Sequence, residues 1–274
     1  MSTSAVDVPA ALPAERRRPM PSLRHLTGAL PYILSFAALL LTWHVAATFI
    51  VRSVLFPAPA SVMMKAGELL ASGVLVDNMV ASLQRILGGF LIGSALGIPI
   101  GLAIGSFQLT RKLLEPWTEF LRFIPATGMI TISVIWFGIG EESKIFLIIY
   151  TTIFIVILNT AAGVASIAPN KLRAAQVLGA TRWQMFILVA LPATVPFILT
   201  GMRLAMANSF TTIVAAELVS AQAGLGVMLW NARMFMLVDD IFVSLMTLGI
   251  LGFTADRLFR FAIYRFAGRY NPVA

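Results

Sequence analysis

Residues 168–192, APNKLRAAQVLGATRWQMFILVALP, are a partly polar interruption between two of the most apolar segments of the chain. We expect a short helix that begins with Asn170 as its N-cap and ends at Gly179, a residue free to adopt a positive φ. Thr181 can cap a second, amphipathic segment, and Pro192 suits the first turn of the helix that follows. The stretch therefore predicts two helices joined by a sharp turn at a membrane surface.

The rest of the composition is that of a membrane protein. Of the 274 residues, 59% are hydrophobic and only 12% are charged, and the mean hydropathy is +0.90. Apolar runs of about 20 residues are typical of membrane-spanning helices, whereas barrel strands would alternate in polarity over about 10 residues. We predict an all-α polytopic membrane protein with about six transmembrane helices. The candidate spans are residues 30–51, 86–107, 123–138, 145–167, 193–219 and 241–261.

The formal charge of +8 is distributed as a topology signal rather than as a nucleic-acid-binding face. Basic residues gather before the first span and after the second, fourth and sixth spans, which with six spans all lie on one side. The positive-inside rule makes that side cytoplasmic. We therefore expect both termini in the cytoplasm and no nucleic-acid partner. The residues concerned are Arg16, Arg17, Arg18, Arg24, Arg111, Lys112, Lys171, Arg173, Arg182, Arg257, Arg260, Arg265 and Arg269.

The chain has no cysteine and two histidines that are far apart in the sequence, His25 and His44. We expect no disulfide, no metal site and no catalytic residue. The predicted organisation is a flexible cytoplasmic tail at 1–29, a first transmembrane helix at 30–51, an external loop with a surface helix at 52–81, a core of about five spans at 82–267 that includes the 168–192 loop, and a cytoplasmic tail at 268–274.

The second span carries glycines at intervals of four residues, from Gly89 and Gly93 through Gly97 to Gly101 and Gly105. Residues with this spacing share one helix face. Small residues on such a face allow two membrane helices to approach closely. The spacing predicts a tightly packed helix pair.

The third and fifth spans contain the candidate translocation path. The third is interrupted by Pro125 and Gly128, and interrupted membrane helices often line substrate paths. The fifth carries several polar groups, which in a span face the bundle interior or an aqueous cavity. For Asn208, Thr211 and Thr212, lining a path and bonding between helices are equally open. The candidate path residues are Pro125, Thr127, Asn208, Ser209, Thr211, Thr212 and Glu217.

Two further expectations concern charged groups. We expect Arg203 to form a structural ion pair with Glu119 or Glu115. Residues 141–144, Glu-Glu-Ser-Lys, are predicted to be an outward-facing turn with solvated charges, because the phosphate-loop pattern they superficially suggest lacks its glycine before the lysine.

The 168–192 loop resembles the EAA motif of ABC-importer permeases, and we call it the coupling loop. Its Arg173-Ala174-Ala175, Gly179, Val189 and Leu191-Pro192 have the spacing of that motif. Arg173 stands at the acidic position, so the role of the usual glutamate is not carried over. From about residue 56 to the C-terminus the chain is similar to the nitrate/sulfonate/taurine-type permeases. The motifs are Ser82-Leu83-Gln84-Arg85, Gly97-Ile98-Pro99-Ile100-Gly101, Trp136-Phe137-Gly138-Ile139-Gly140 with Lys144, Leu178-Gly179-Ala180, Gly201-Met202-Arg203 and Ala215-Ala216-Glu217.

The resemblance implies a MetI-like permease of a type I importer in the bacterial cytoplasmic membrane. It implies a second permease subunit, forming a homodimer, two cytoplasmic ABC ATPase subunits and an external solute-binding protein that delivers a small anion such as nitrate, taurine or an alkanesulfonate. ATP and Mg would bind to the ATPase subunits, since this chain has no Walker A loop and no cofactor of its own. The resemblance assigns ATPase coupling to Asn170, Arg173, Ala174, Ala175, Gln176, Gly179, Ala180, Leu191 and Pro192.

Two other functions compete with this interpretation. Composition alone does not separate a permease subunit from a secondary transporter or channel that works without an ATPase. The paired-helix coupling loop favours the permease, because a self-sufficient carrier needs no docking loop. A membrane-embedded enzyme lacks support, since no catalytic cluster stands at usable spacing.

Overall fold

The computed structural model describes residues 24–51, 53–218 and 221–267, and the regular structure within these residues is helical. The chain divides into two units, one ending at Arg52 and the other beginning at Ser53. The predicted C-terminal tail at 268–274 lies outside the described residues, as does most of the predicted tail at 1–29. The described end of that N-terminal segment, from Arg24, already belongs to helix α1.

The first unit contains one long helix. Helix α1 (Arg24–Val45) continues into a short π-helical segment, η1 (Ala46–Val51), and together they cover the predicted span 30–51. Most of its large apolar side chains are exposed in the isolated chain. A helix that is apolar on all sides is suited to a lipid environment.

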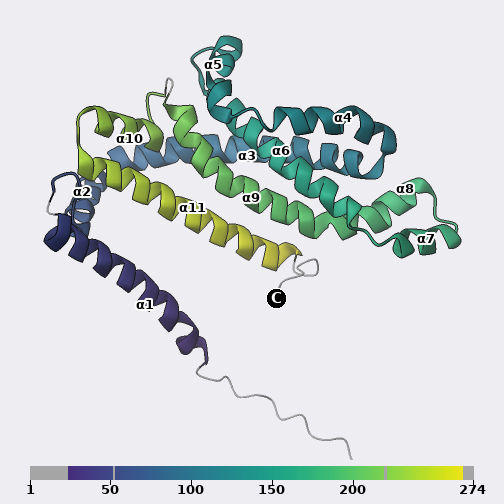
Figure 1. Ribbon diagram of the computed structural model, residues 1–274, viewed down its shortest axis with the longest axis horizontal. Helices are drawn as coiled ribbons and strands as arrows, with labels where there is room; N and C mark the ends of the chain where they lie inside the picture. The colour runs from purple at the N-terminus through teal and green to yellow at the C-terminus, as the bar shows by residue number, and fades with distance from the viewer. Residues whose placement is uncertain (1–23, 52, 219–220, 268–274) are drawn as a thin grey trace, which may run out of the picture. The chain divides into compact units, whose positions relative to one another are not determined.

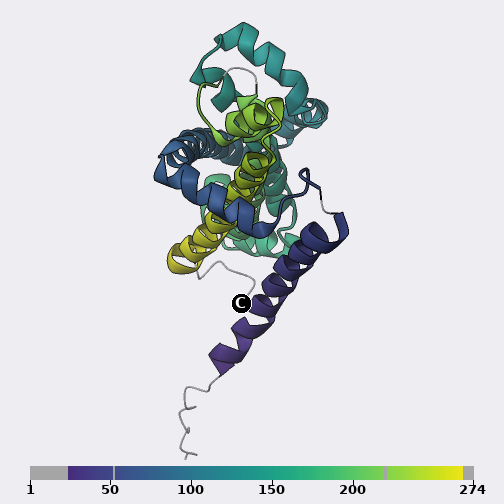
Figure 2. The same ribbon diagram turned by 90° about the vertical axis from the view of Figure 1, so that its left-hand side faces the viewer.

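The second unit is a helix bundle (Figure 1). Its long helices run along one common direction, with α7 and α8 at one end and α10 at the other, and Figure 2 shows the bundle from the α10 side. We call these the α7 end and the α10 end. The helices are α2 (Pro59–Ala71), α3 (Val74–Ser106), α4 (Gln108–Leu121), α5 (Ala126–Phe137), α6 (Glu141–Ala165), α7 (Pro169–Val177), α8 (Arg182–Met185), η2 (Phe186–Ala190), α9 (Leu191–Glu217), α10 (Leu225–Met234) and α11 (Val238–Ala267).

The prediction of about six spans is confirmed. Five helical segments among the described residues are long and apolar enough to cross a membrane: Pro31–Val51, Val74–Ser106, Glu141–Ala165, Arg182–Glu217 and Val238–Arg265. Helices α4 and α5 make a sixth span if they are counted together, and their axes are bent by 102°. The bend occurs before α5, whose N-cap is Pro125, whereas Gly128 lies inside α5. Of the two predicted breaks, only the one at Pro125 occurs.

The glycine-rich face of α3 packs closely against another helix, as predicted, and the structure shows that this helix is α6. A Cβ atom built on Gly93 would lie 2.8 Å from Cβ of Thr152, and one built on Gly101 would lie 2.7 Å from Cβ of Thr160. Such contacts are shorter than carbon atoms allow. Only glycine lets α3 and α6 approach this closely. The glycines at 89, 97 and 105 face α6 in the same way.

Helix α6 is packed on its other side against α9. A Cβ atom on Gly163 of α6 would meet Phe197 of α9 at 2.6 Å, and one on Gly201 of α9 would meet Asn159 of α6 at 2.6 Å. Helix α6 therefore lies between α3 and α9 and ties the bundle together. Its Ile148 and Val156 have no exposed surface.

Candidate functional site

The first helix of the coupling loop begins two residues earlier than predicted. The N-cap of α7 is Ala168, Pro169 occupies the first helical position, and the Asn170 side chain makes no capping hydrogen bond. The prediction of Asn170 as the N-cap is therefore wrong. Proline is favoured at the first helical position because its φ is already helical and the missing N–H would be unpaired there anyway. Pro169 decides the start of the helix.

The turn after α7 has the predicted geometry. Gly179 has a φ of +78°, and the N–H groups of Gly179 and Ala180 bond to carbonyls of the last turn of α7. Thr181 caps α8: its hydroxyl accepts the Gln184 N–H at 3.2 Å, and the Gln184 side chain accepts the Thr181 N–H at 2.8 Å. This reciprocal pair is a capping box. It fixes the direction in which the chain leaves the turn.

The segment that follows the turn is one continuous helix, in which α8 passes through η2 into α9. The N–H of Leu191 bonds to the carbonyl of Phe186, five residues earlier. This π-type bond precedes Pro192, which stands in the first turn of α9 as predicted. Since proline has no N–H to donate, the wider π turn accommodates it within a helix that does not break.

Two faces of α7 have different surroundings. Leu172 and Ala175 are half-buried against the rest of the chain, whereas Arg173 and Ala174 are exposed. At the end of the helix, Val177 is 88% exposed and Leu178 is 86% exposed. No residue of α7 is buried. An apolar tip on a short polar loop is the kind of surface that a protein partner covers.

Near the bend between α4 and α5, a cavity of about 450 Å³ opens toward α6 and α9, and we call it the path cavity. Three of the predicted path residues line it: Pro125, Asn208 and Thr212. Asn208 donates to the Thr212 hydroxyl at 3.4 Å, and the hydroxyls of Thr212 and Thr151 are 3.3 Å apart. The wall therefore carries a connected row of polar side chains from α6 and α9.

The same cavity has lining residues that the sequence did not indicate as part of a path. Arg122 supplies a guanidinium, which lies 4.8 Å from the Phe123 ring centre. Tyr150 donates its hydroxyl to the Leu121 carbonyl at 2.6 Å, so it holds the end of α4 beside the cavity. The signal for Arg122 was its position: it is a cation three residues before Pro125, the proline that interrupts an apolar segment.

The other predicted path residues lie elsewhere. Thr127 is exposed on α5, and Thr211 lines a separate cavity of about 300 Å³ between α9 and α11. Ser209 is buried between α6 and α9, where its hydroxyl is 3.3 Å from that of Thr152. Glu217 is 1% exposed and belongs to a polar network at the α10 end. The path cavity thus contains three of the seven predicted residues, and a role in transport for the other four stays a prediction.

The network around Glu217 is buried and extensive. Its carboxylate accepts hydrogen bonds from the Ser82 hydroxyl, the Arg85 guanidinium and the Gly226 N–H, each at 2.7 Å. Arg85 also donates to the Ala223 carbonyl at 2.6 Å and to Glu141 at 2.9 Å. These bonds tie α3, α6 and α9 to the start of α10. Glu217 is therefore fully paired within the protein.

The prediction of a solvated turn at 141–144 is wrong. Glu141 begins α6 and pairs with Arg85, and the Lys144 ammonium donates to Glu141 at 2.9 Å. Lys144 is only 4% exposed and Ser143 only 2%. The four residues look like a charged turn in the sequence because their partner, Arg85, is 56 residues away.

The predicted partner of Arg203 is also wrong. Arg203 pairs with Asp256 of α11, with Nη2 and Oδ2 3.2 Å apart, rather than with Glu115 or Glu119. Asp256 also binds Arg260, with Nε and Oδ2 3.0 Å apart. This cluster connects α9 to α11.

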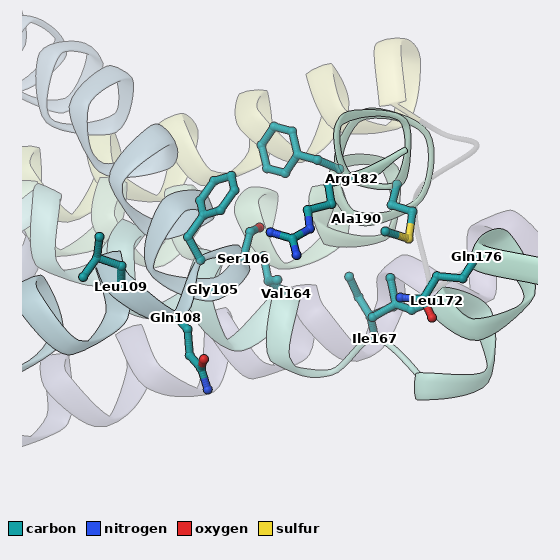
Figure 3. A pocket seen from close by; sticks show the side chains of 13 residues that line it. Gly105, Ser106, Gln108, Leu109, Val164, Ile167, Leu172, Gln176, Arg182 and Ala190 are labelled. Carbon is teal, nitrogen blue, oxygen red and sulfur yellow. The ribbon is translucent and has the colours of Figure 1, made fainter. Parts of the chain in front are cut away.

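A second cavity, of about 710 Å³, lies beside the coupling loop, and we call it the loop-side cavity (Figure 3). It lies between the end of α3, the end of α6 and the segment from α7 to η2. Most of its walls are apolar, and the side chains that can donate hydrogen bonds into it include Ser106, Gln176 and Arg182. Leu172 and Gln176 face it from α7, on the side opposite the exposed tip of that helix.

Comparison with known proteins identifies the family. Residues 93–269 match the family described as the binding-protein-dependent transport system inner membrane component. The chain belongs to this family. The permease is 40% identical over 237 residues to the "Probable ABC transporter permease protein" of Brucella melitensis biotype 1, covering 86% of this chain and 96% of that one. It is 39% identical over 229 residues to the taurine transport system permease protein of Escherichia coli K12, covering 81% and 83%.

The permease also has the fold expected of its family. The solved structure of the MetNI methionine ABC transporter, in an inward-facing conformation, superimposes with a TM-score of 0.57 at 18% identity, covering 68% of this chain and 95% of that chain. The predicted MetI-like fold and the resemblance to taurine-, sulfonate- and nitrate-type permeases are confirmed. This chain is a multi-pass membrane subunit of an ABC importer whose ATPase is a separate subunit, and the alternative of a carrier without an ATPase is not favoured.

Proposed function

We propose that this permease forms, with a second copy of itself, the translocation path for a small anionic solute, driven by two ATPase subunits that dock on the coupling loop. An external binding protein would deliver the solute to the α10 end. ATP and Mg would be held by the ATPase subunits. In this arrangement the α7 end and both termini face the cytoplasm of a bacterium, in agreement with the basic residues near the span ends.

The observation that carries the proposal is the exposed apolar tip of α7. Val177 and Leu178 project from a short loop whose turn is fixed by Gly179 and by the capping box of Thr181. The helix behind this tip is joined through α8 and η2 to α9, which contributes Asn208 and Thr212 to the path cavity. A movement of α7 would therefore be transmitted along one continuous helix to the path cavity.

Three features support an anionic solute. The path cavity carries the guanidinium of Arg122, and its wall contains no carboxylate among the described residues. Asn208, Thr151 and Thr212 supply amide and hydroxyl donors. The Escherichia coli relative is named for the transport of taurine, a solute that carries a sulfonate group. Guanidinium and hydroxyl donors are well matched to the oxygens of such groups.

The test is co-purification of the ATPase subunits with a Leu178→Asp variant. A charge at the centre of an apolar contact should remove most of the bound ATPase, because desolvating an unpaired carboxylate is costly. Phe235→Asp is the matched control. Phe235 is 74% exposed in the turn after α10, at the other end of the bundle. Full retention of the ATPase by the Leu178→Asp protein would refute docking at this tip.

A further inference from the structure

Two hydrogen-bond donors face the loop-side cavity without an acceptor. The Ser106 hydroxyl at the end of α3 is buried and has no hydrogen-bond partner in the described part of the chain. The Arg182 guanidinium has no carboxylate partner there either. Figure 3 shows the Arg182 side chain reaching into the cavity, toward the side where Ser106 lies. The two groups come from separate helices and are directed at the same space.

The local charge favours an anion in that space. A helix C-terminus carries partial negative charge, which would disfavour an anion at the end of α3. Arg111 offsets this charge, because its guanidinium donates to the carbonyls of Ile104 at 3.3 Å and Gly105 at 3.2 Å. Arg182 is then free to act as a charge-assisted donor to an external oxyanion, with Ser106 as a second donor.

The remaining walls favour an oxyanion that carries long apolar chains. Phe107 and Leu109 line the cavity and are 48% and 71% exposed. Trp183, which is 65% exposed, stacks on the lining residue Phe186 with ring centres 5.5 Å apart. The cavity lies where three membrane spans end, and tryptophan is enriched at that level of a bilayer. A cationic pocket between span ends is a site for an acidic lipid headgroup.

We propose that the loop-side cavity binds the phosphate group of an anionic phospholipid, with Arg182 and Ser106 as its donors. The acyl chains extend over the apolar rim at Phe107 and Leu109. A lipid in this position contacts the end of α3 and both helices of the coupling loop, since Leu172 and Gln176 of α7 and Arg182 of α8 line the same cavity. The bound lipid therefore bridges the end of α3 and the coupling loop.

The test measures lipid binding to the purified, complete importer by native mass spectrometry. The probes are dioctanoyl phosphatidylglycerol, dioctanoyl phosphatidylcholine and inorganic phosphate. We expect preferential binding of phosphatidylglycerol, weakened about tenfold in Arg182→Gln, because a charge-assisted hydrogen bond is lost. Arg182→Lys should retain part of the affinity, and Ser106→Ala should reduce it by a smaller factor.

Lys112→Gln is the matched control, since Lys112 is an exposed cation at the α7 end that does not line the cavity. An equal loss of phosphatidylglycerol affinity in Lys112→Gln and Arg182→Gln would indicate general attraction of acidic lipid to basic residues, and it would overturn the proposal of a site in this cavity. Equal binding of the two lipids, or displacement of phosphatidylglycerol by inorganic phosphate at similar concentration, would overturn the assignment to a lipid. This readout does not depend on ATPase docking, so its failure is distinguishable from failure of the Leu178→Asp experiment.

Discussion

Arg85 of α3 and Glu217 of α9 form a buried ion pair, with Nη1 and Oε1 2.7 Å apart. The side chain of Glu217 is fully buried and that of Arg85 is 7% exposed. If either residue lost its partner, the remaining buried charge would carry a large, uncompensated desolvation penalty. The pair therefore fixes α3, α9 and the start of α10 relative to one another at the α10 end, away from the coupling loop.

Removing one member of this pair should strongly destabilise the protein. We predict that Arg85→Met lowers the free energy of unfolding by about 3–5 kcal/mol, because Glu217 remains buried and uncompensated. The double variant Arg85→Met/Glu217→Gln should regain part of that stability. The measurement is the midpoint of thermal unfolding in detergent.

The control for this prediction is Lys65→Met. Lys65 pairs with Glu68 at 3.1 Å and lies 3.9 Å from Asp240, and its side chain is 35% exposed, so the loss should be only about 0–1 kcal/mol. An Arg85→Met protein that unfolds at the wild-type temperature would show that the pair makes no net contribution to stability.

Gly179 gives a prediction that separates backbone conformation from steric bulk. A Cβ at this position would meet no atom within 4 Å, yet the φ of +78° is unfavourable for a β-branched residue. Gly179→Val should lose most of the solute-stimulated ATPase activity of the importer while inserting normally. Gly179→Asn should retain much more, since asparagine tolerates this conformation. Equal activity of the two variants would show that the positive φ is not required for coupling.

The glycine face of α3 provides a matched pair of substitutions on one helix. Gly93→Ala should cost about 1–3 kcal/mol, because its methyl group would lie 2.8 Å from Cβ of the buried Thr152 and force α3 away from α6. Gly88→Ala meets nothing within 4 Å and should be neutral or slightly stabilising, since alanine is the better helix former. Thermal unfolding of the two variants in detergent decides between them. Equal stability of the two variants would mean that α3 and α6 can move apart at the glycine face without a measurable loss of stability.

Features that depend on neighbouring residues could be predicted from the sequence. The spans follow from continuous apolar runs, and the closely packed face of α3 follows from glycines at a period of four residues, although the spacing does not say that the partner is α6. The turn follows from the conformational freedom of Gly179, and the start of α8 follows from the ability of Thr181 to cap a helix. In each case the residues that decide the structure lie within a few turns of helix.

Features that depend on distant partners could not be predicted. Arg85 pairs with residues 56 and 132 positions away, so residues 141–144 resembled a solvated turn. Arg203 has two plausible acidic partners in the sequence, and its observed partner, Asp256, is decided by the packing of α9 on α11. A general signal was available: two opposite charges inside apolar segments, such as Arg85 and Glu217, are expected to pair.

The path cavity yields the last prediction. Arg122 is its cation and stands at the bend between α4 and α5, while Lys112 of α4 does not line the cavity. Uptake is measured with the solute that thermally stabilises the cognate binding protein. At low solute concentration, Arg122→Gln should reduce this uptake about tenfold, because a charged donor to the anion is lost. Lys112→Gln should change uptake by less than about twofold, since an exposed charge contributes little. If Arg122→Gln left uptake unchanged, or if the stabilising solute were a cation, the anionic path would be ruled out.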